Sequence, residues 1–162
     1  MTQLITLILS NIPAIMFVAA LIAALLAPKS RRFRARLLDW MLLLSIGISY
    51  VWAGFFHVFF PELAARSIGW ALSPFQFEIG VADMAIGIAA IASFWRSLPF
   101  KAAVVVYIAL FSLGVAIGHV REAVGAGDFA ANNFGLLLLI TVAQMILLPI
   151  LLRLAWSDGN SG

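Results

Sequence analysis

The chain contains no cysteine among its 162 residues. This absence excludes disulfide bonds, thiolate metal ligands and thiol redox chemistry. With two histidines and seven carboxylates, any metal site would have to use nitrogen and oxygen ligands. The sequence also lacks a phosphate-binding loop, a dinucleotide fingerprint and a nucleophile beside a base, so it offers no complete catalytic motif.

Charged residues are scarce as well, at 10% of the chain, whereas soluble domains carry about 25%. Hydrophobic residues make up 64%, which is more than a water-soluble fold of this size can bury. The net charge of +3 comes from basic residues beside apolar runs. We therefore interpret the basic residues as topological signals, exclude nucleic acid as a partner, and expect the chain to reside in a lipid bilayer.

Five apolar runs are long enough for membrane helices, because a hydrocarbon core about 30 Å thick needs about 20 helical residues. No run alternates with period two as a barrel strand would, so the sequence predicts an all-α polytopic bundle. The first run lacks a positive leading region and is too long for a signal peptide, so we expect it to be retained. Pro13 should kink that helix or mark its start. One domain over residues 1–162 is predicted, with helices at about 4–27, 37–60, 75–95, 102–119 and 134–152.

The positions of Lys and Arg predict the orientation, because cytoplasmic loops are enriched in these residues. The N-terminus is expected outside and the C-terminus in the cytoplasm of a bacterial inner membrane. Two longer segments then lie outside: residues 61–74, with a short amphipathic helix at 62–70, and residues 120–133, a flexible connection. The cytoplasmic side carries Lys29, Arg31, Arg32, Arg34, Arg36, Arg96, Lys101 and Arg153, and the outer side carries Arg66 and Arg121.

Small residues predict how the helices pack. Gly80 and Gly87 lie seven residues apart on the third helix, and Gly114 and Gly118 form a GxxxG pattern on the fourth. Such positions let backbones approach closely where the hydrophobic effect cannot drive association. We therefore expect the third and fourth helices to pack tightly against each other.

Polar residues gather at similar depth on the outward half of four helices. Burying a carboxylate in a bilayer costs several kcal/mol unless it is paired, protonated or metal-bound, so these residues need partners. On the fifth helix, Asn133, Leu137, Thr141 and Gln144 form a stripe that should face the bundle interior. The candidate ligand-binding residues are His57, Gln76, Glu78, Asp83, His119 and Asn133.

The two acidic candidates cannot point the same way. Glu78 and Asp83 are five residues apart, which is roughly 140° around an α-helix. Gln76 and Asp83, seven residues apart, share a face. Glu78 shares its face with small and apolar residues, so we expect its carboxylate to enter an apolar pocket.

Three interpretations of this cluster remain open. The first is a metal site of His57, Glu78 and His119, completed by Asn133 or water, which suits zinc, iron or copper. The second is a small-molecule or proton site in which Glu78 and the histidines titrate together. The third is structural, with His57 bonded to Glu78 and His119 paired with Glu122. No local motif such as HExxH decides among them.

One stretch carries a family resemblance. The segment WAGFFHVFFPELAARSIGWALSPFQFEIGVADMAIG, with the later GHVREAV and NNFG, resembles a group of small uncharacterised bacterial membrane proteins. These are similar to the wider DoxX-like set of four-helix membrane proteins, and the resemblance covers the second to fifth helices. It implies that His57, Glu78 and His119 belong to one site, and it suggests oxidoreductase partners and sulfur or quinone metabolism.

The sequence thus predicts a membrane protein with a ligand- or metal-binding pocket on the periplasmic half of the bundle, accessory to a membrane redox complex. A second hypothesis is a small proton-coupled transporter, built as a homo-oligomer, with a polar path running inward past Asp83. A third is a structural subunit whose lipid-facing helices pack on a larger membrane protein partner.

Overall fold

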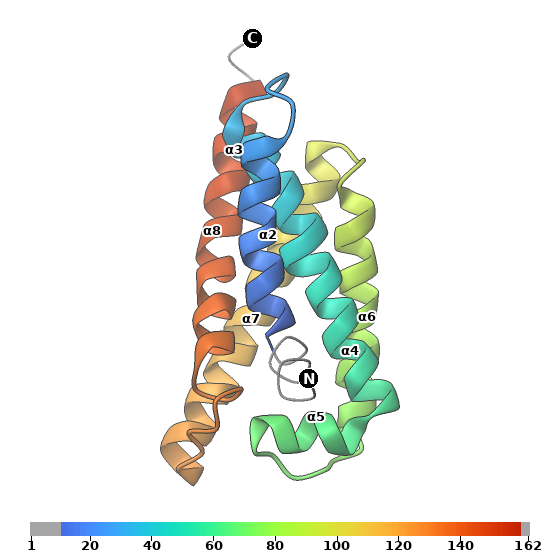
Figure 1. The fold of residues 1–162 in the computed structure, drawn as a ribbon, viewed down its shortest axis with the longest axis vertical. Helices are drawn as coiled ribbons and strands as arrows, with labels where there is room; N and C mark the ends of the chain where they lie inside the picture. The colour runs from blue at the N-terminus through green and yellow to red at the C-terminus, as the bar shows by residue number, and fades with distance from the viewer. Residues whose placement is uncertain (1–10, 160–162) are drawn as a thin grey trace, which may run out of the picture.

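The computed structural model describes residues 11–159, and all regular secondary structure in that range is helical. The segments α3, η1 and α4 follow one another without a break and form one long helix (Figure 1). The prediction of an all-α fold is confirmed for this range. In chain order the elements are α2 (Ile12–Leu26), α3 (Phe33–Trp40), the π-helix η1 (Met41–Ile48), α4 (Ser49–Phe59), α5 (Pro61–Ile68), α6 (Phe75–Ser93), α7 (Leu98–Ala126) and α8 (Leu136–Gly159).

Four of these helices are long and apolar enough to cross a membrane, and they make the chain a multi-pass membrane protein. α2 is also apolar but has only 15 residues, with Pro13 in its first turn. Residues 4–10 of the predicted first membrane helix lie outside the described range, so five spans with the N-terminus outside stays a prediction. The four spans are Phe33–Phe59, Phe75–Ser93, Leu98–Ala126 and Leu136–Asp158.

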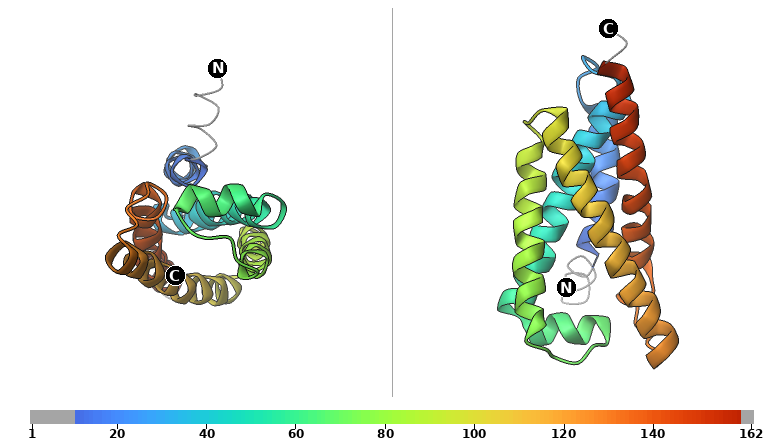
Figure 2. Two further views of the ribbon diagram at one scale, coloured as in Figure 1. Left: turned by 90° about the horizontal axis from the view of Figure 1, so that it is seen from below. Right: turned by 180° about the vertical axis from the view of Figure 1, so that it is seen from behind.

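The long helices form two pairs, α4 with α6 and α7 with α8. α2 packs beside α3, η1 and α8 and closes one side of the bundle (Figure 2, left). From the turn after α6, α7 runs away from α6 toward the end of the bundle where α5 lies across the helices (Figures 1 and 2). The bundle is therefore narrow at the end that carries α3, called the α3 end below, and wide at the opposite α5 end.

An apolar core fills the α3 end. Its central side chains come from the second, fourth and fifth predicted membrane helices and are packed together. Leu38, Met41, Leu42, Ile108 and Leu148 each expose 1% or less of their surface. This core holds the two helix pairs together at the α3 end.

The close packing between helices involves α4 and α6, which corrects the prediction that the third and fourth helices pack tightly. A Cβ added at Gly54 would lie 2.5 Å from the Gly80 carbonyl oxygen, and one at Gly87 would lie 2.9 Å from the Gly47 carbonyl oxygen. Within residues 11–159, no neighbouring atom lies within 4 Å of a Cβ built at Gly114 or Gly118. Glycine spacing alone cannot distinguish these two cases, because glycine at helical spacing marks both a contact and a hollow.

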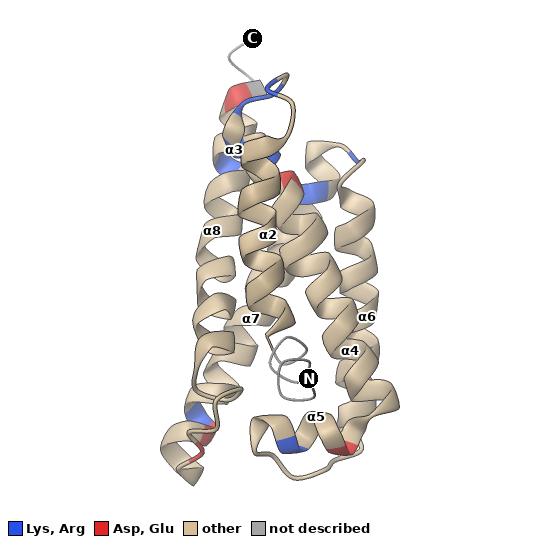
Figure 3. Cartoon of the chain, viewed as in Figure 1, with Lys and Arg blue, Asp and Glu red and all other residues tan. Residues whose placement is uncertain are grey.

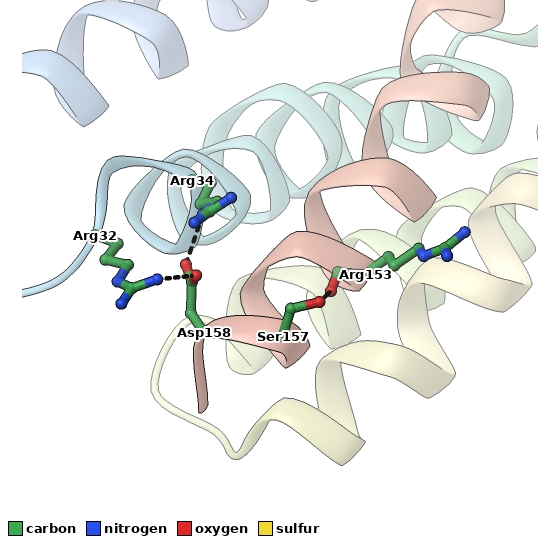
Figure 4. Close-up of polar contacts among 5 residues, drawn as sticks. All are labelled: Arg32, Arg34, Arg153, Ser157 and Asp158. Atoms are coloured by element: carbon green, nitrogen blue, oxygen red, sulfur yellow. Dashed lines mark hydrogen bonds and ion pairs between the residues drawn. The ribbon is translucent and has the colours of Figure 1, made fainter. Parts of the chain in front are cut away.

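Basic residues gather at the α3 end (Figure 3), and several of them form ion pairs. The Asp39 carboxylate pairs with Arg31 and with the buried Lys101, whose Nζ lies 2.6 Å from Asp39 Oδ1. Arg32 and Arg34 pair with Asp158 at 2.5 and 2.7 Å (Figure 4). These ion pairs join α8 and α7 to the start of the second membrane helix.

The connections at the α5 end differ in part from those predicted. The amphipathic helix predicted at 62–70 is present as α5, which ends at Gly69 in the left-handed conformation. α7 continues to Ala126 and ends at Gly127, so half of the segment predicted to be a flexible connection is helix. The prediction stopped where apolar residues stop, but a helix that projects beyond the hydrocarbon core can continue with polar residues.

Candidate functional site

A cavity of about 510 Å³ lies between the α4–α6 pair and the α7–α8 pair. It occupies the wide part of the bundle and reaches from α5 to the edge of the apolar core. Its walls are mostly apolar, with a small number of polar groups. The described lining consists of Pro13, Ser45, Ser49, Tyr50, Ala53, His57, Ile68, Trp70, Ile79, Asp83, Leu110, Phe111, Gly114, Val115, Gly118, His119, Leu137, Ile140, Thr141 and Gln144.

The wall from the second membrane helix is a row of every fourth residue: Ser45, Ser49, Ala53 and His57. Four residues make slightly more than one α-helical turn, so such a row drifts around a regular α-helix. Ser45 lies in η1, where the π-helical i→i+5 bonding makes each turn wider. The wider turn keeps Ser45 close to the face that carries Ser49, so the local winding extends the polar wall inward.

The opposite wall comes from α7 and α8. Gly114 and Gly118 lack side chains where the cavity is hollow, so the GxxxG pattern makes room in place of a helix contact. On α8, Thr141 bonds to its own helix, and Gln144 Nε2 donates to Ser45 Oγ at 2.8 Å. The predicted polar stripe on α8 therefore faces the bundle interior, and Gln144 and Ser45 close the cavity floor.

His119 belongs to a hydrogen-bonded cluster at the α5 end. Asn133 is fully buried, and its Oδ1 lies 2.6 Å from His119 Nδ1 and accepts from Trp70 Nε1 at 3.2 Å. Asn133 Nδ2 donates to the Asp128 carbonyl oxygen at 2.7 Å. The Trp70 ring lies against the imidazole, with centroids 5.4 Å apart. Asn133 thus fixes both the loop before α8 and the tryptophan that follows α5.

His57 has a separate partner on α6. Its Nδ1 lies 2.8 Å from Gln76 Nε2. The amide is a donor, so this bond requires Nδ1 to be the unprotonated imidazole nitrogen and leaves Nε2 as the N–H. The structural interpretation paired His57 with Glu78 and His119 with Glu122; in the structure, amides take both places.

Asp83 and Ser49 differ from the other buried polar residues of the cavity lining in their lack of hydrogen-bond partners among the described residues. The Asp83 side chain is buried with 7% exposure, yet its carboxyl group makes no hydrogen bond or ion pair with any described residue. Ser49 is 4% exposed, and its Oγ also lacks a hydrogen-bond partner within residues 11–159. Two polar groups therefore line the cavity without a hydrogen-bond partner in the part of the chain that the structure describes.

Glu78 lies outside this site, contrary to the expectation that its carboxylate enters an apolar pocket. It is exposed in the first turn of α6, on a different face from the buried Gln76 and Asp83. A carboxylate near a helix N-terminus is favoured by the helix dipole and reaches water without a partner. The packing of α6 on α4 sets which face turns inward, and Glu78 is not on it.

The predicted metal site of His57, Glu78 and His119 is not supported. Within the described range, no group of three or more His, Asp or Glu side chains is placed to hold a metal ion. Two histidines line the cavity, but each has its Nδ1 engaged by an amide, and Glu78 does not join them. The predicted zinc, iron or copper site therefore lacks its carboxylate ligand, Glu78.

A family model described as a family of unknown function, DUF6790, matches residues 10–161. The chain belongs to this family. The match agrees with the resemblance to uncharacterised membrane proteins but gives no link to the DoxX-like set, which stays a prediction. No curated protein and no solved structure matches the chain. The family match therefore assigns no activity, and any function must be argued from the cavity.

Sequence reasoning missed several members of the cavity. Ser45 and Ser49 are small residues within an apolar run, and either one taken alone resembles a serine at a helix contact. Trp70 lies in the connection after α5, and no sequence pattern links its indole N–H to Asn133, which it reaches in the structure. The row of Ser45, Ser49, Ala53 and His57, at intervals of four residues, was the signal that could have found this wall.

Proposed function

We propose that this chain is a multi-pass protein of the bacterial inner membrane that binds a small, largely apolar organic molecule in the cavity between its two helix pairs. The observation that carries the proposal is a cavity of about 510 Å³ whose lining includes Asp83, a buried carboxyl group that has no hydrogen-bond or ion-pair partner among the described residues. Ligand sites are usually mostly apolar hollows of about 300–1,000 Å³ with a few polar groups. This cavity has both properties.

The cavity faces the periplasm in this proposal. The α3 end carries the basic loops, and the positive-inside rule assigns that end to the cytoplasm. The α5 end, where His57, Trp70 and His119 line the cavity, then lies at the periplasmic surface. A ligand would enter from the outside or from the outer leaflet.

Binding is favoured over transport because the polar lining stops inside the bundle. The transporter hypothesis requires a polar path that continues inward past Asp83. Beyond Ser45 and Gln144, which bond to each other, the described interior is the apolar core around Leu42 and Leu148. Proposals of a redox partner, a larger complex or a homo-oligomer stay predictions from the resemblance and the sequence.

The proposal can be tested with the neutral probe phenylbutanol, using the purified protein in detergent and its thermal unfolding midpoint. Gly118→Leu fills the cavity, whereas Gly125→Leu makes the same change on the same helix outside it. The probe should raise the midpoint of the natural protein and of Gly125→Leu, because a ligand at about 100 times its Kd adds about 2.7 kcal/mol. Gly118→Leu should show no rise. Equal shifts in all three proteins would mean that the probe acts through the detergent, and the proposal would be wrong.

A further inference from the structure

The two buried carboxylates of the described bundle, Asp39 and Asp83, have different surroundings. At the α3 end, Asp39 pairs with Lys101, whose side chain is only 4% exposed, and with Arg31. In the cavity, Asp83 has no cationic partner, and no Lys or Arg is among the described lining residues. An ionised carboxylate in a low-dielectric interior is costly unless a positive charge accompanies it. Lys101 and Arg31 provide that positive charge at Asp39, whereas no described Lys or Arg lines the cavity at Asp83.

The cavity that Asp83 lines also carries a serine hydroxyl group and aromatic rings. Ser49 Oγ has no hydrogen-bond partner among the described residues and lines the same cavity. The rings of Tyr50 and Phe111 lie with centroids 6.2 Å apart and form part of the wall. An ammonium group offers N–H donors and no acceptor, so it matches a carboxylate and a hydroxyl oxygen. Aromatic faces attract cations in addition.

A bare metal cation fits this lining less well. Hard cations such as Ca²⁺ take six to eight oxygen ligands, and Mg²⁺ requires near-octahedral geometry. The described residues bring one carboxylate to the cavity and no cluster of three metal-binding side chains. The apolar walls, formed by residues such as Leu110, Val115 and Ile140, instead match a hydrocarbon body.

We infer that the cavity takes a small organic cation, a primary or secondary amine with an apolar body, and that Asp83 is its counter-ion. This inference rests on the proposed function, because it names the class of molecule that the same cavity binds. The apolar body lies along the α7 and α8 walls, and the ammonium group lies at Asp83 and Ser49. No bond is made or broken.

The test compares phenylbutylamine with phenylbutanol, which has nearly the same shape and lacks the charge. Dissociation constants are measured for the natural protein, for Asp83→Asn and for the filled-cavity variant Gly118→Leu at one pH and one detergent concentration. The amine should bind the natural protein at least about tenfold more tightly than the alcohol, which corresponds to about 1.4 kcal/mol. Asp83→Asn should remove this preference and leave alcohol binding unchanged, and Gly118→Leu should weaken both probes.

Three results would overturn the inference, and they separate it from the proposed function. Equal binding of both probes to the natural protein would show a cavity that takes neutral molecules, with Asp83 protonated. An amine preference that persists in Asp83→Asn would assign the charge recognition to another group. Failure of both probes to bind would refute the proposed function and this inference together. The first comparison needs no variant, so it stands even if Asp83→Asn does not fold.

Discussion

Two glycine substitutions on different membrane helices should have opposite effects on stability. In Gly54→Ala the new methyl group would lie 2.5 Å from the Gly80 carbonyl oxygen and 2.8 Å from the Met84 backbone nitrogen. Both are backbone atoms, so no side chain can rotate away, and α4 and α6 must separate by about 1 Å to reach ordinary contact at 3.4 Å. Overpacking of this kind costs about 1–3 kcal/mol.

Gly118→Ala is the matched control. No neighbouring atom of the described residues lies within 4 Å of its new methyl group, and alanine is the better helix former by about 0.5–1 kcal/mol. The free energies of unfolding of the two variants should therefore differ by about 1.5–4 kcal/mol, with Gly54→Ala the less stable. Unfolding in mixed micelles with increasing SDS, followed by circular dichroism, measures this difference. If Gly118→Ala lost as much stability as Gly54→Ala, α7 would pack through its GxxxG pattern, and the cavity assignment would be wrong.

Three further predictions concern ionisable and amide residues. Asp39→Asn should cost about 3–5 kcal/mol, because it leaves the buried Lys101 without its carboxylate, while Lys101→Met should cost less because Asp39 keeps Arg31; equal losses in the SDS titration would contradict this. Asn133→Ala should lower the unfolding free energy by about 2–4 kcal/mol, since it leaves several buried hydrogen-bonding groups without a partner; a loss below about 0.5 kcal/mol would count against the cluster. Glu78→Gln should change stability by less than about 0.5 kcal/mol, because the side chain is exposed; a larger loss would indicate an unrecognised partner.

Much of the fold could be predicted because lipid imposes few solutions. Apolar runs of membrane length, without period-two alternation, leave helices as the available structure, and four such spans are present. The segregation of polar residues toward one half of the bundle could also be predicted, since Thr141 and Gln144 lie on one helical stripe. What periodicity could not supply was the rotation of each helix about its own axis.

The rotation of α6 about its axis determines which of the two acidic candidates, Glu78 and Asp83, faces the bundle interior. Spacing showed that Glu78 and Asp83 point in different directions, but it could not show which of them points inward. The answer depends on α6 packing on α4 through Gly80 and Gly87, which turns Asp83 to the interior. The same packing leaves Gly114 on α7 without a close neighbour. A sequence pattern records that a residue is small and does not record what lies opposite it.

The cluster at the α5 end also has a kinetic consequence. Within the described range, the side-chain hydrogen bond that ties Trp70 to the loop before α8 is a neutral one, from its indole N–H to Asn133. Such a bond contributes about 0.5–1.5 kcal/mol net, so breaking it changes the share of open molecules by roughly tenfold at most. Thermal motion opens such a contact often, whereas separating α4 from α6 requires a closely packed backbone interface to part. If the cavity binds a ligand as proposed, entry at this end has to break only this bond and the ring contact between Trp70 and His119, so the cavity walls and Asp83 would set the dwell time of the ligand.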